Sequence, residues 1–212
     1  LMGNRFELSV VAGEEEADWA NTQLDAAISE IQRIEALLST YRPDSQTNQI
    51  NEAAGLHPVK VDREVFDLVA RSIRISELTQ GAFDLSYGSI DKRLWNFDTQ
   101  LEALPDPKTA KRMVRLINYR NIILDEPAQT VFLKEAGMRI GFGGIGKGYA
   151  AEMTRRFLKA RGVESGVVNA AGDLTVWGNQ PNGQPWTIGI AHPDAKDCPF
   201  SSLTISDMAV AT

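Results

Sequence analysis

A glycine-rich segment between a short apolar run and a predicted helix constrains this chain more than any other feature. Residues 141–148, Gly-Phe-Gly-Gly-Ile-Gly-Lys-Gly, contain five glycines. Residues at helical spacing follow, at Ala150, Met153, Phe157, Leu158 and Arg161. Main-chain N–H groups at glycines can approach a ligand closely because no Cβ stands in the way. The start of a helix adds unpaired donors and partial positive charge. With Lys147 beside them, these groups predict a place that holds phosphates.

Two common nucleotide-binding patterns fit this segment incompletely. The pattern G-x-G-x-x-G at 141–146 matches the dinucleotide fingerprint, which needs a preceding strand and an acidic residue at the end of the next strand. Here the preceding run is interrupted at 134–137, and the nearby acid, Glu164, comes before the next apolar run. A P-loop needs Ser or Thr where Gly148 stands. A glycine-rich turn that only packs a helix on a sheet is a third interpretation.

The composition is that of an ordinary globular protein, with 43% hydrophobic and 24% charged residues among 212. The net charge of −6 argues against a nucleic-acid-binding surface, which needs clustered Lys and Arg. No apolar run approaches the roughly 20 residues needed to cross a bilayer. The lone Cys198 excludes an internal disulfide and predicts a passive thiol. His57 and His192 each stand beside a proline, and we expect surface or structural roles for both.

Hydrophobic periodicity predicts one α+β domain, with helices packed on a mainly antiparallel sheet. We expect helices at about 16–39, at 62–79 with Asp62 as N-cap, and from about 105 to 118. Polar, turn-rich sequence predicts loops at 40–45 and 82–88. We expect strands at 6–10, 122–124, 130–133, 138–142, 166–169, 174–177, 186–191, 203–205 and 208–211. Helices come first and antiparallel-looking strands later, which is typical of the α+β class.

Six separated stretches, taken together and in this order, resemble the ApbE family, the FAD:protein FMN transferases. They are Met-Gly-Asn-Arg-Phe at 2–6, residues 38–45 with Ile50-Asn51, residues 81–84 with Leu94-Trp95, then 143–150, 169–173 and 185–186. The resemblance covers essentially the whole chain. It implies a single ApbE-like, T-fold-related domain over residues 1–212.

The resemblance also implies an activity. Such an enzyme binds FAD as its substrate and, with Mg²⁺, transfers the FMN half to a threonine hydroxyl of a flavoprotein, such as a redox-pump subunit, releasing AMP. The alternative is an FAD-binding module that lacks transferase activity or hydrolyses FAD slowly. A periplasmic or extracytoplasmic location follows from the resemblance, with a lipid anchor in the inner membrane and no nucleic-acid partner.

Several residues of this chain match family positions that line the FAD site. By resemblance they are Met2, Tyr41, Ala82, Phe83, Asp84, Gly141 and Lys147, and the carbonyl of Gly144 is a main-chain metal ligand. Tyr41 offers a flat face for a ring, Asp84 can accept hydrogen bonds from adenine or ribose, and Lys147 can meet a phosphate. Each also has a structural interpretation: a loop aromatic, a loop cap and a solvated lysine. Asp173 is equally a site residue or a turn residue. No residue is singled out as the catalytic group that activates the threonine.

Two departures from the family pattern qualify these expectations. Gly141 stands where family members commonly have Asp, which removes one carboxylate from the expected FAD site. A Ser-Gly segment, a His-Ile-Asp-Pro stretch and an Asp…Thr metal-binding motif, which follow in the family, do not occur in these 212 residues. We therefore expect the C-terminal part of the domain to be missing from this chain.

Overall fold

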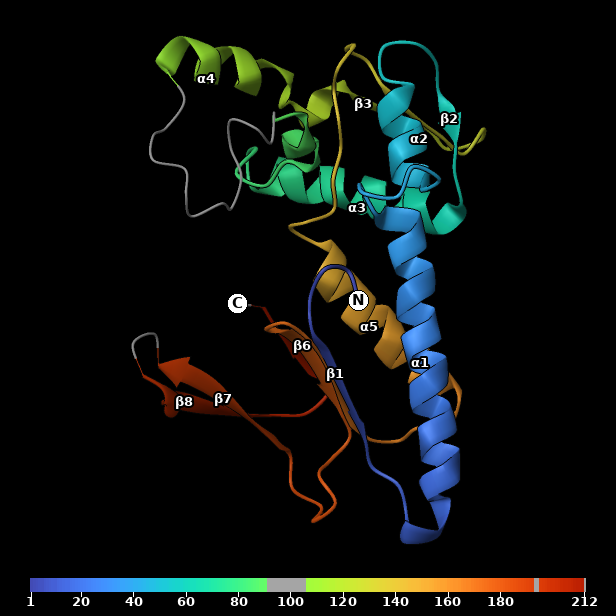
Figure 1. The fold of residues 1–212 in the computed structure, drawn as a ribbon, viewed down its shortest axis with the longest axis vertical. Coiled ribbons are helices and arrows are strands. Elements are labelled where there is room, and N and C mark those ends of the chain that lie inside the picture. The colour runs from blue at the N-terminus through green and yellow to red at the C-terminus, as the bar shows by residue number, and fades with distance from the viewer. Residues whose placement is uncertain (91–105, 193–194, 212) are drawn as a thin grey trace. The chain divides into compact units, whose positions relative to one another are not determined.

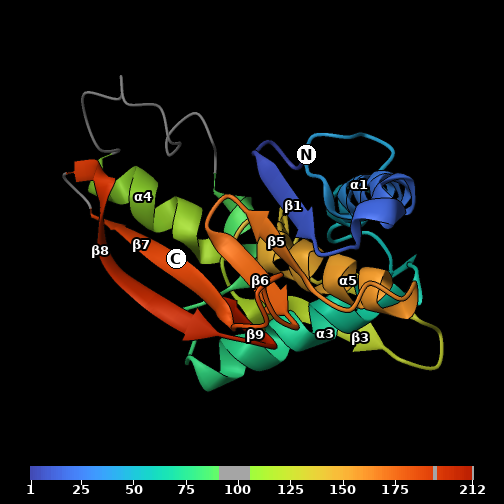
Figure 2. The ribbon, with the colours of Figure 1, turned by 90° about the horizontal axis from the view of Figure 1, so that it is seen from below.

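The computed structural model describes residues 1–90, 106–192 and 195–211, and its contacts group the chain into two compact units (Figures 1 and 2). The first unit consists of residues 1–35 and 146–212, and the second of residues 36–145. Both combine helices with antiparallel strands, so the α+β prediction is confirmed. The Leu94-Trp95 pair and the start of the helix expected from 105 lie outside the described residues.

The first unit is built on a four-stranded antiparallel sheet. Its strands are, in spatial order, β1 (Phe6–Val10), β5 (Gly166–Ala170), β6 (Asp173–Trp177) and β9 (Met208–Val210). Phe6 pairs with Ala170, and Gly166 pairs with Trp177. Burial alternates along β5, because successive side chains of a strand point to opposite faces. The strands expected at these four places are confirmed.

Two helices cover the buried face of this sheet. Helix α1 (Ala17–Leu38) follows the short 3₁₀ helix η1 (Glu14–Glu16), and α5 (Gly146–Ala160) follows the glycine segment. The core that they share with the sheet consists of Ala27, Ala151, Leu158, Val163, Val168, Ala170 and Trp177. The indole N–H of Trp177 donates a 2.9 Å hydrogen bond to the Val163 carbonyl, which satisfies its one polar atom inside the core.

A two-stranded hairpin completes the first unit. Strands β7 (Trp186–His192) and β8 (Ala195–Ile205) lie side by side (Figure 2) and pair antiparallel, with register shifts between Ile190 and His192. The sequence predicted only the end of β8, at 203–205. Cys198 lies on β8 and His192 ends β7.

The second unit has a three-stranded antiparallel sheet in the order β2 (Val59–Lys60), β4 (Thr130–Leu133), β3 (Ile122–Asp125). Helix α3 (Arg63–Leu78) lies where it was expected, with Asp62 at the N-cap position but without a side-chain cap bond. The shorter helices are α2 (Gln46–Glu52), η2 (Leu85–Ser89), α4 (Pro107–Met113), η3 (Val114–Leu116) and η4 (Tyr119–Asn121).

Helix α2 is one of the elements that hydrophobic periodicity missed. Its seven residues are mostly polar and too few to display a repeating apolar face. Its one local signal is Ser45, whose Oγ accepts a 3.1 Å bond from the Asn48 N–H in the manner of an N-cap.

The strand expected at 138–142 is wrong. Met138, Ile140 and Phe142 are buried, but the segment pairs with no strand. Instead the Asn51 side chain bonds both main-chain groups of Ile140, and the Gly141 N–H donates to the Leu85 carbonyl at 3.1 Å. An apolar run shows that a segment is buried, but it does not reveal which groups satisfy the backbone.

Among the described helices, none is both long enough and apolar enough to cross a membrane.

Candidate functional site

The glycine segment leaves the second unit as an irregular turn and enters the first unit as α5. The Ile145 N–H donates to the Phe142 carbonyl at 3.0 Å, and the helix begins at Gly146. Gly141 and Phe142 are buried, whereas Gly143 and Gly144 are exposed. The exposed glycines therefore present main-chain atoms to solvent or to a ligand, immediately before the start of a helix.

Space, and not an unusual backbone angle, explains two of these glycines. Gly141, Gly143 and Gly144 all have negative φ, so other residues could adopt their conformation. A Cβ on Gly143, however, would overlap the hydroxyl oxygen of Tyr87, and one on Gly144 would lie 3.2 Å from the Phe83 ring. Packing within the protein therefore requires glycine at both positions, because Tyr87 and Phe83 already occupy the space that a Cβ would take.

Tyr87 is a member of this site that sequence analysis missed. It lies on η2, and its hydroxyl oxygen accepts a 3.2 Å hydrogen bond from the Gly143 N–H. Burial raises the pKa of the Tyr87 phenol above its ordinary value of 10.0, although the bond from Gly143 acts in the opposite direction. The phenol is therefore neutral at physiological pH. The 82–88 loop gave no signal for this contact, because only the fold places it beside residue 143.

Asp84 anchors the turn that carries Tyr87. Its Oδ1 accepts bonds from the N–H and the hydroxyl of Ser86, at 2.8 and 2.6 Å, and its Oδ2 accepts the Tyr119 N–H at 2.9 Å. The capping role that sequence analysis left open is thus present. Contact between Asp84 and FAD remains a prediction.

Tyr41 and Phe83 supply ring surface beside the glycine segment. Tyr41 is 84% exposed, in a loop where the Ser39 hydroxyl accepts its N–H at 3.1 Å. Phe83 faces Gly144, and Ala82 next to it is exposed. In the second unit, the predicted residues at positions 41, 82–84, 141 and 144 therefore come from three segments that converge around Tyr87.

Met2 and Lys147 belong to the first unit. Met2 sits in a turn with φ of 51°, and the Asn4 side chain bonds its carbonyl at 3.3 Å. The Lys147 ammonium lies 3.4 Å from the Asp173 carboxylate, and both side chains are mostly buried. Lys147 is thus not simply solvated. Asp173 starts β6 directly after a tight turn at Ala171-Gly172, so it is a turn-adjacent residue and an ion-pair partner together.

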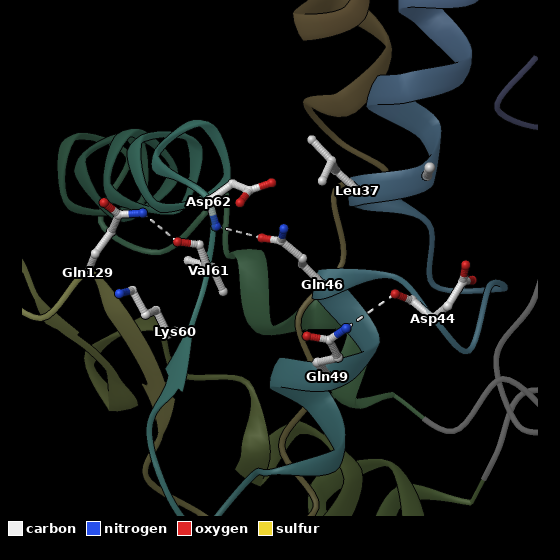
Figure 3. Close-up of a pocket in the computed structure, with 9 residues that line it drawn as sticks. Leu37, Asp44, Gln46, Gln49, Lys60, Val61, Asp62 and Gln129 are labelled. Carbon is white, nitrogen blue, oxygen red and sulfur yellow. Dashed lines mark hydrogen bonds between the residues drawn. The ribbon is translucent and has the colours of Figure 1, made fainter.

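A cavity of about 450 Å³ lies elsewhere in the second unit (Figure 3). Its walls include the end of α1, the start of α2 and the strand β2, and the Gln46 side chain accepts the Asp62 N–H there at 2.7 Å. No predicted FAD residue lines it, and its lining holds no aromatic ring on which a flavin could stack. We assign no ligand to this cavity.

Comparisons with known proteins identify the family of this chain. The family model described as "ApbE family" matches residues 2–212. The chain belongs to the ApbE family. A relative from Klebsiella pneumoniae (strain 342), named FAD:protein FMN transferase, is 36% identical over 183 residues, which cover 86% of this chain and 56% of the relative. A Treponema pallidum (strain Nichols) protein of the same name is 29% identical and matches 90% of this chain and 57% of its own length.

Solved ApbE structures share the fold. The crystal structure of the ApbE protein from Thermotoga maritima superposes with a TM-score of 0.85 at 26% identity, over 99% of this chain and 67% of that one. The chain spans little more than half the length of the Klebsiella and Treponema relatives. The dinucleotide-fingerprint interpretation is excluded, because β5 pairs antiparallel with both neighbours and residues 134–140, which lead into the glycines, form no strand.

The ApbE resemblance implies FAD and a metal, and the residues present fit the two groups unequally. The exposed main chain at Gly144, with the ring of Phe83 beside it, fits a nucleotide diphosphate. For a metal, no cluster of three or more His, Cys, Asp or Glu side chains exists in the described ranges. The Gly144 carbonyl remains a predicted ligand, but Gly141 offers no carboxylate beside it and both oxygens of Asp84 already accept protein hydrogen bonds.

Proposed function

We propose that this chain supplies the FAD-binding part of an FAD:protein FMN transferase. The substrate is FAD, and the acceptor is a threonine of a flavoprotein such as a redox-pump subunit. The observation that carries the proposal is the ApbE match over residues 2–212.

The proposed reaction does not require a strong nucleophile. The threonine oxygen forms a bond to the phosphorus on the riboflavin side, the bridging P–O bond breaks, AMP leaves, and the threonine proton is released. Such a transfer depends mainly on positioning and on stabilising negative charge. In the second unit the exposed main chain at Gly144 is suited to contact the diphosphate, and in the first unit the Lys147 ammonium supplies a positive charge suited to a phosphate. Tyr41 and Phe83 provide ring surface for the flavin or adenine.

The test is to incubate the intact protein with FAD, Mg²⁺ and a flavoprotein acceptor, and to search by mass spectrometry for an FMN adduct on threonine. The matched control is the acceptor with that threonine changed to valine, which keeps the shape and removes the hydroxyl. Detection of FMN on the threonine-containing acceptor, and not on the valine control, supports transfer. FAD binding without any adduct contradicts it.

The second candidate is an FAD-binding module that does not transfer FMN or only hydrolyses FAD slowly. Gly141, in place of the Asp common in the family, favours it, as does the engagement of Asp84 within the protein. Release of AMP and free FMN, with no labelled acceptor, would support this candidate.

Two further parts of the proposal concern the metal and the location. We infer Mg²⁺ dependence from the family alone and assign no step to the ion, and its omission should abolish labelling. We also infer an extracytoplasmic site of action, with a lipid anchor in the inner membrane. Fractionation of cells tests this, and recovery of the protein in the cytosol contradicts it.

A further inference from the structure

Tyr87 has hydrogen-bonding capacity that the fold does not use. Its oxygen accepts the Gly143 N–H at 3.2 Å, and the side chain as a whole is 42% exposed. A phenol can accept and donate at the same time. Among the residues that the structure describes, no acceptor is found for the phenolic proton.

The hydrogen bond from Gly143 to Tyr87 changes which hydrogen-bond donors the site can offer to a ligand. While the Gly143 N–H points to the Tyr87 oxygen, it is not available to a phosphate. Hydrogen bonds in a chain polarise one another, so an oxygen that accepts an N–H makes its own O–H a better donor. Because the Gly143 N–H is donated to Tyr87, the Tyr87 hydroxyl is the group that can donate a hydrogen bond to a ligand in its place. Because its pKa is raised by burial, the phenol keeps its proton at neutral pH.

We propose that Tyr87 is a further ligand-binding residue, which accepts the Gly143 N–H and donates its own O–H to the diphosphate of FAD. This inference rests on the proposed function. The surroundings agree with it: the Tyr87 hydroxyl lies near both Gly141 and Gly143, and Phe83 lies near Gly144, so these side chains line the glycine segment. No other hydroxyl is described in contact with the Gly143 N–H.

A bracing role is the competing explanation, in which Tyr87 only holds the glycine segment in shape. The two explanations differ in ligand dependence. A bond to the diphosphate serves FAD and not riboflavin, which has no phosphate. A brace affects both ligands, because it acts through the shape of the site.

The test compares the intact protein with its Tyr87→Phe variant, which keeps the ring and removes only the hydroxyl. Flavin fluorescence gives the Kd for FAD and for riboflavin in each. We expect the Kd for FAD to rise about tenfold or more, as for loss of a hydrogen bond to a charged group, and the Kd for riboflavin to stay unchanged. Tyr119→Phe is the matched control, since it removes a hydroxyl from a buried ring of the same unit.

Three other outcomes would overturn the inference. An equal loss for both ligands means that Tyr87 only braces the segment. An unchanged Kd for FAD in Tyr87→Phe means that the hydroxyl does not meet the ligand, while the proposed function stands. If the unmodified protein does not bind FAD, the proposed function fails, and this inference fails with it.

Discussion

The side chain of Asn51 takes the place of a neighbouring strand for Ile140. Its Nδ2 donates to the Ile140 carbonyl at 3.1 Å, and its Oδ1 accepts the Ile140 N–H at 2.7 Å. Both residues are buried and stand 89 positions apart. One amide side chain thus fixes the backbone immediately before the glycine segment.

Replacing Asn51 with alanine should destabilise the protein strongly. Two buried main-chain groups of Ile140 lose their partners, at a cost of about 1–3 kcal/mol each. We expect urea unfolding to show a free energy of unfolding lower by about 2–4 kcal/mol. Asn182→Ala is the control, because that exposed side chain accepts a hydrogen bond from the nearby Gln184 N–H and forms no hydrogen bond with a distant segment among the described residues. Equal effects of the two changes would contradict a special role for Asn51.

A methyl group at position 143 should disturb the site only while the Tyr87 hydroxyl is present. The added Cβ overlaps that oxygen, but it lies 3.4 Å from the ring carbon behind it, which is ordinary contact. We expect Gly143→Ala to lower stability by about 1–3 kcal/mol through overpacking. In a Tyr87→Phe background the same change should cost much less. A double-mutant cycle of thermal unfolding measures the difference.

Strict additivity of these two changes would mean that the loop moves away from the tyrosine instead of clashing with it. Gly148→Ala is a suitable control on the same segment, because its added Cβ meets no atom within 4 Å.

Changing Asp84 to asparagine should harm both stability and FAD binding. The amide turns one acceptor into a donor that faces another donor, either at Ser86 or at the Tyr119 N–H. We expect unfolding to become easier by about 1–3 kcal/mol. FAD titration of the folded variant then tests the predicted ligand contact. Reduced stability with unchanged FAD affinity would assign Asp84 to the capping role alone.

The first unit contains a carboxylate that should make stability depend on pH. Glu152 accepts hydrogen bonds from Arg155 and then Arg156, which lower the pKa of its carboxyl below 4.5, while partial burial acts in the opposite direction. Because the folded pKa is the lower one, the stabilisation is present above pH 4.5 and is lost as the pH falls through the folded value.

Glu152→Gln should therefore reduce the free energy of unfolding at pH 7, by no more than about 1 kcal/mol because the cluster is partly exposed. The gap between the two proteins should close as the pH falls below 4.5. Glu15→Gln is the control, an exposed glutamate for which the described residues provide no ion-pair partner. A gap that persists in acid would show that packing, not charge, is lost.

Lys147→Gln should weaken FAD binding and make it less sensitive to salt. The ammonium carries the only full positive charge in the glycine segment and lies 3.4 Å from Asp173. Removing a charge that meets the diphosphate reduces the electrostatic part of the affinity, which salt screens. Titrations at two ionic strengths measure the change. An unaltered salt dependence would remove Lys147 from the predicted site.

Local sequence was sufficient where a pattern repeats over many residues. The apolar faces of α1 and α5 and the alternation along β1 predicted these elements, because one side of each must be buried. The ordered stretches from residue 2 to residue 186 also predicted the ApbE family. These signals come from residues close together in the chain, or from motifs preserved in order.

The tertiary structure determined which distant residues form hydrogen bonds with one another. No spacing rule links Asn51 with Ile140, Tyr87 with Gly143 or Asp84 with Tyr119, since each pair is 35 or more residues apart. The expected strand at 138–142 was wrong for the same reason: its apolar residues predicted burial, whereas the Asn51 side-chain amide and the Leu85 carbonyl of η2 supplied its hydrogen bonds. The sequence determined which segments are buried and at which positions of the chain a Cβ is absent. Only folding brought a hydroxyl to the place where that Cβ would be, because long-range packing sets such contacts.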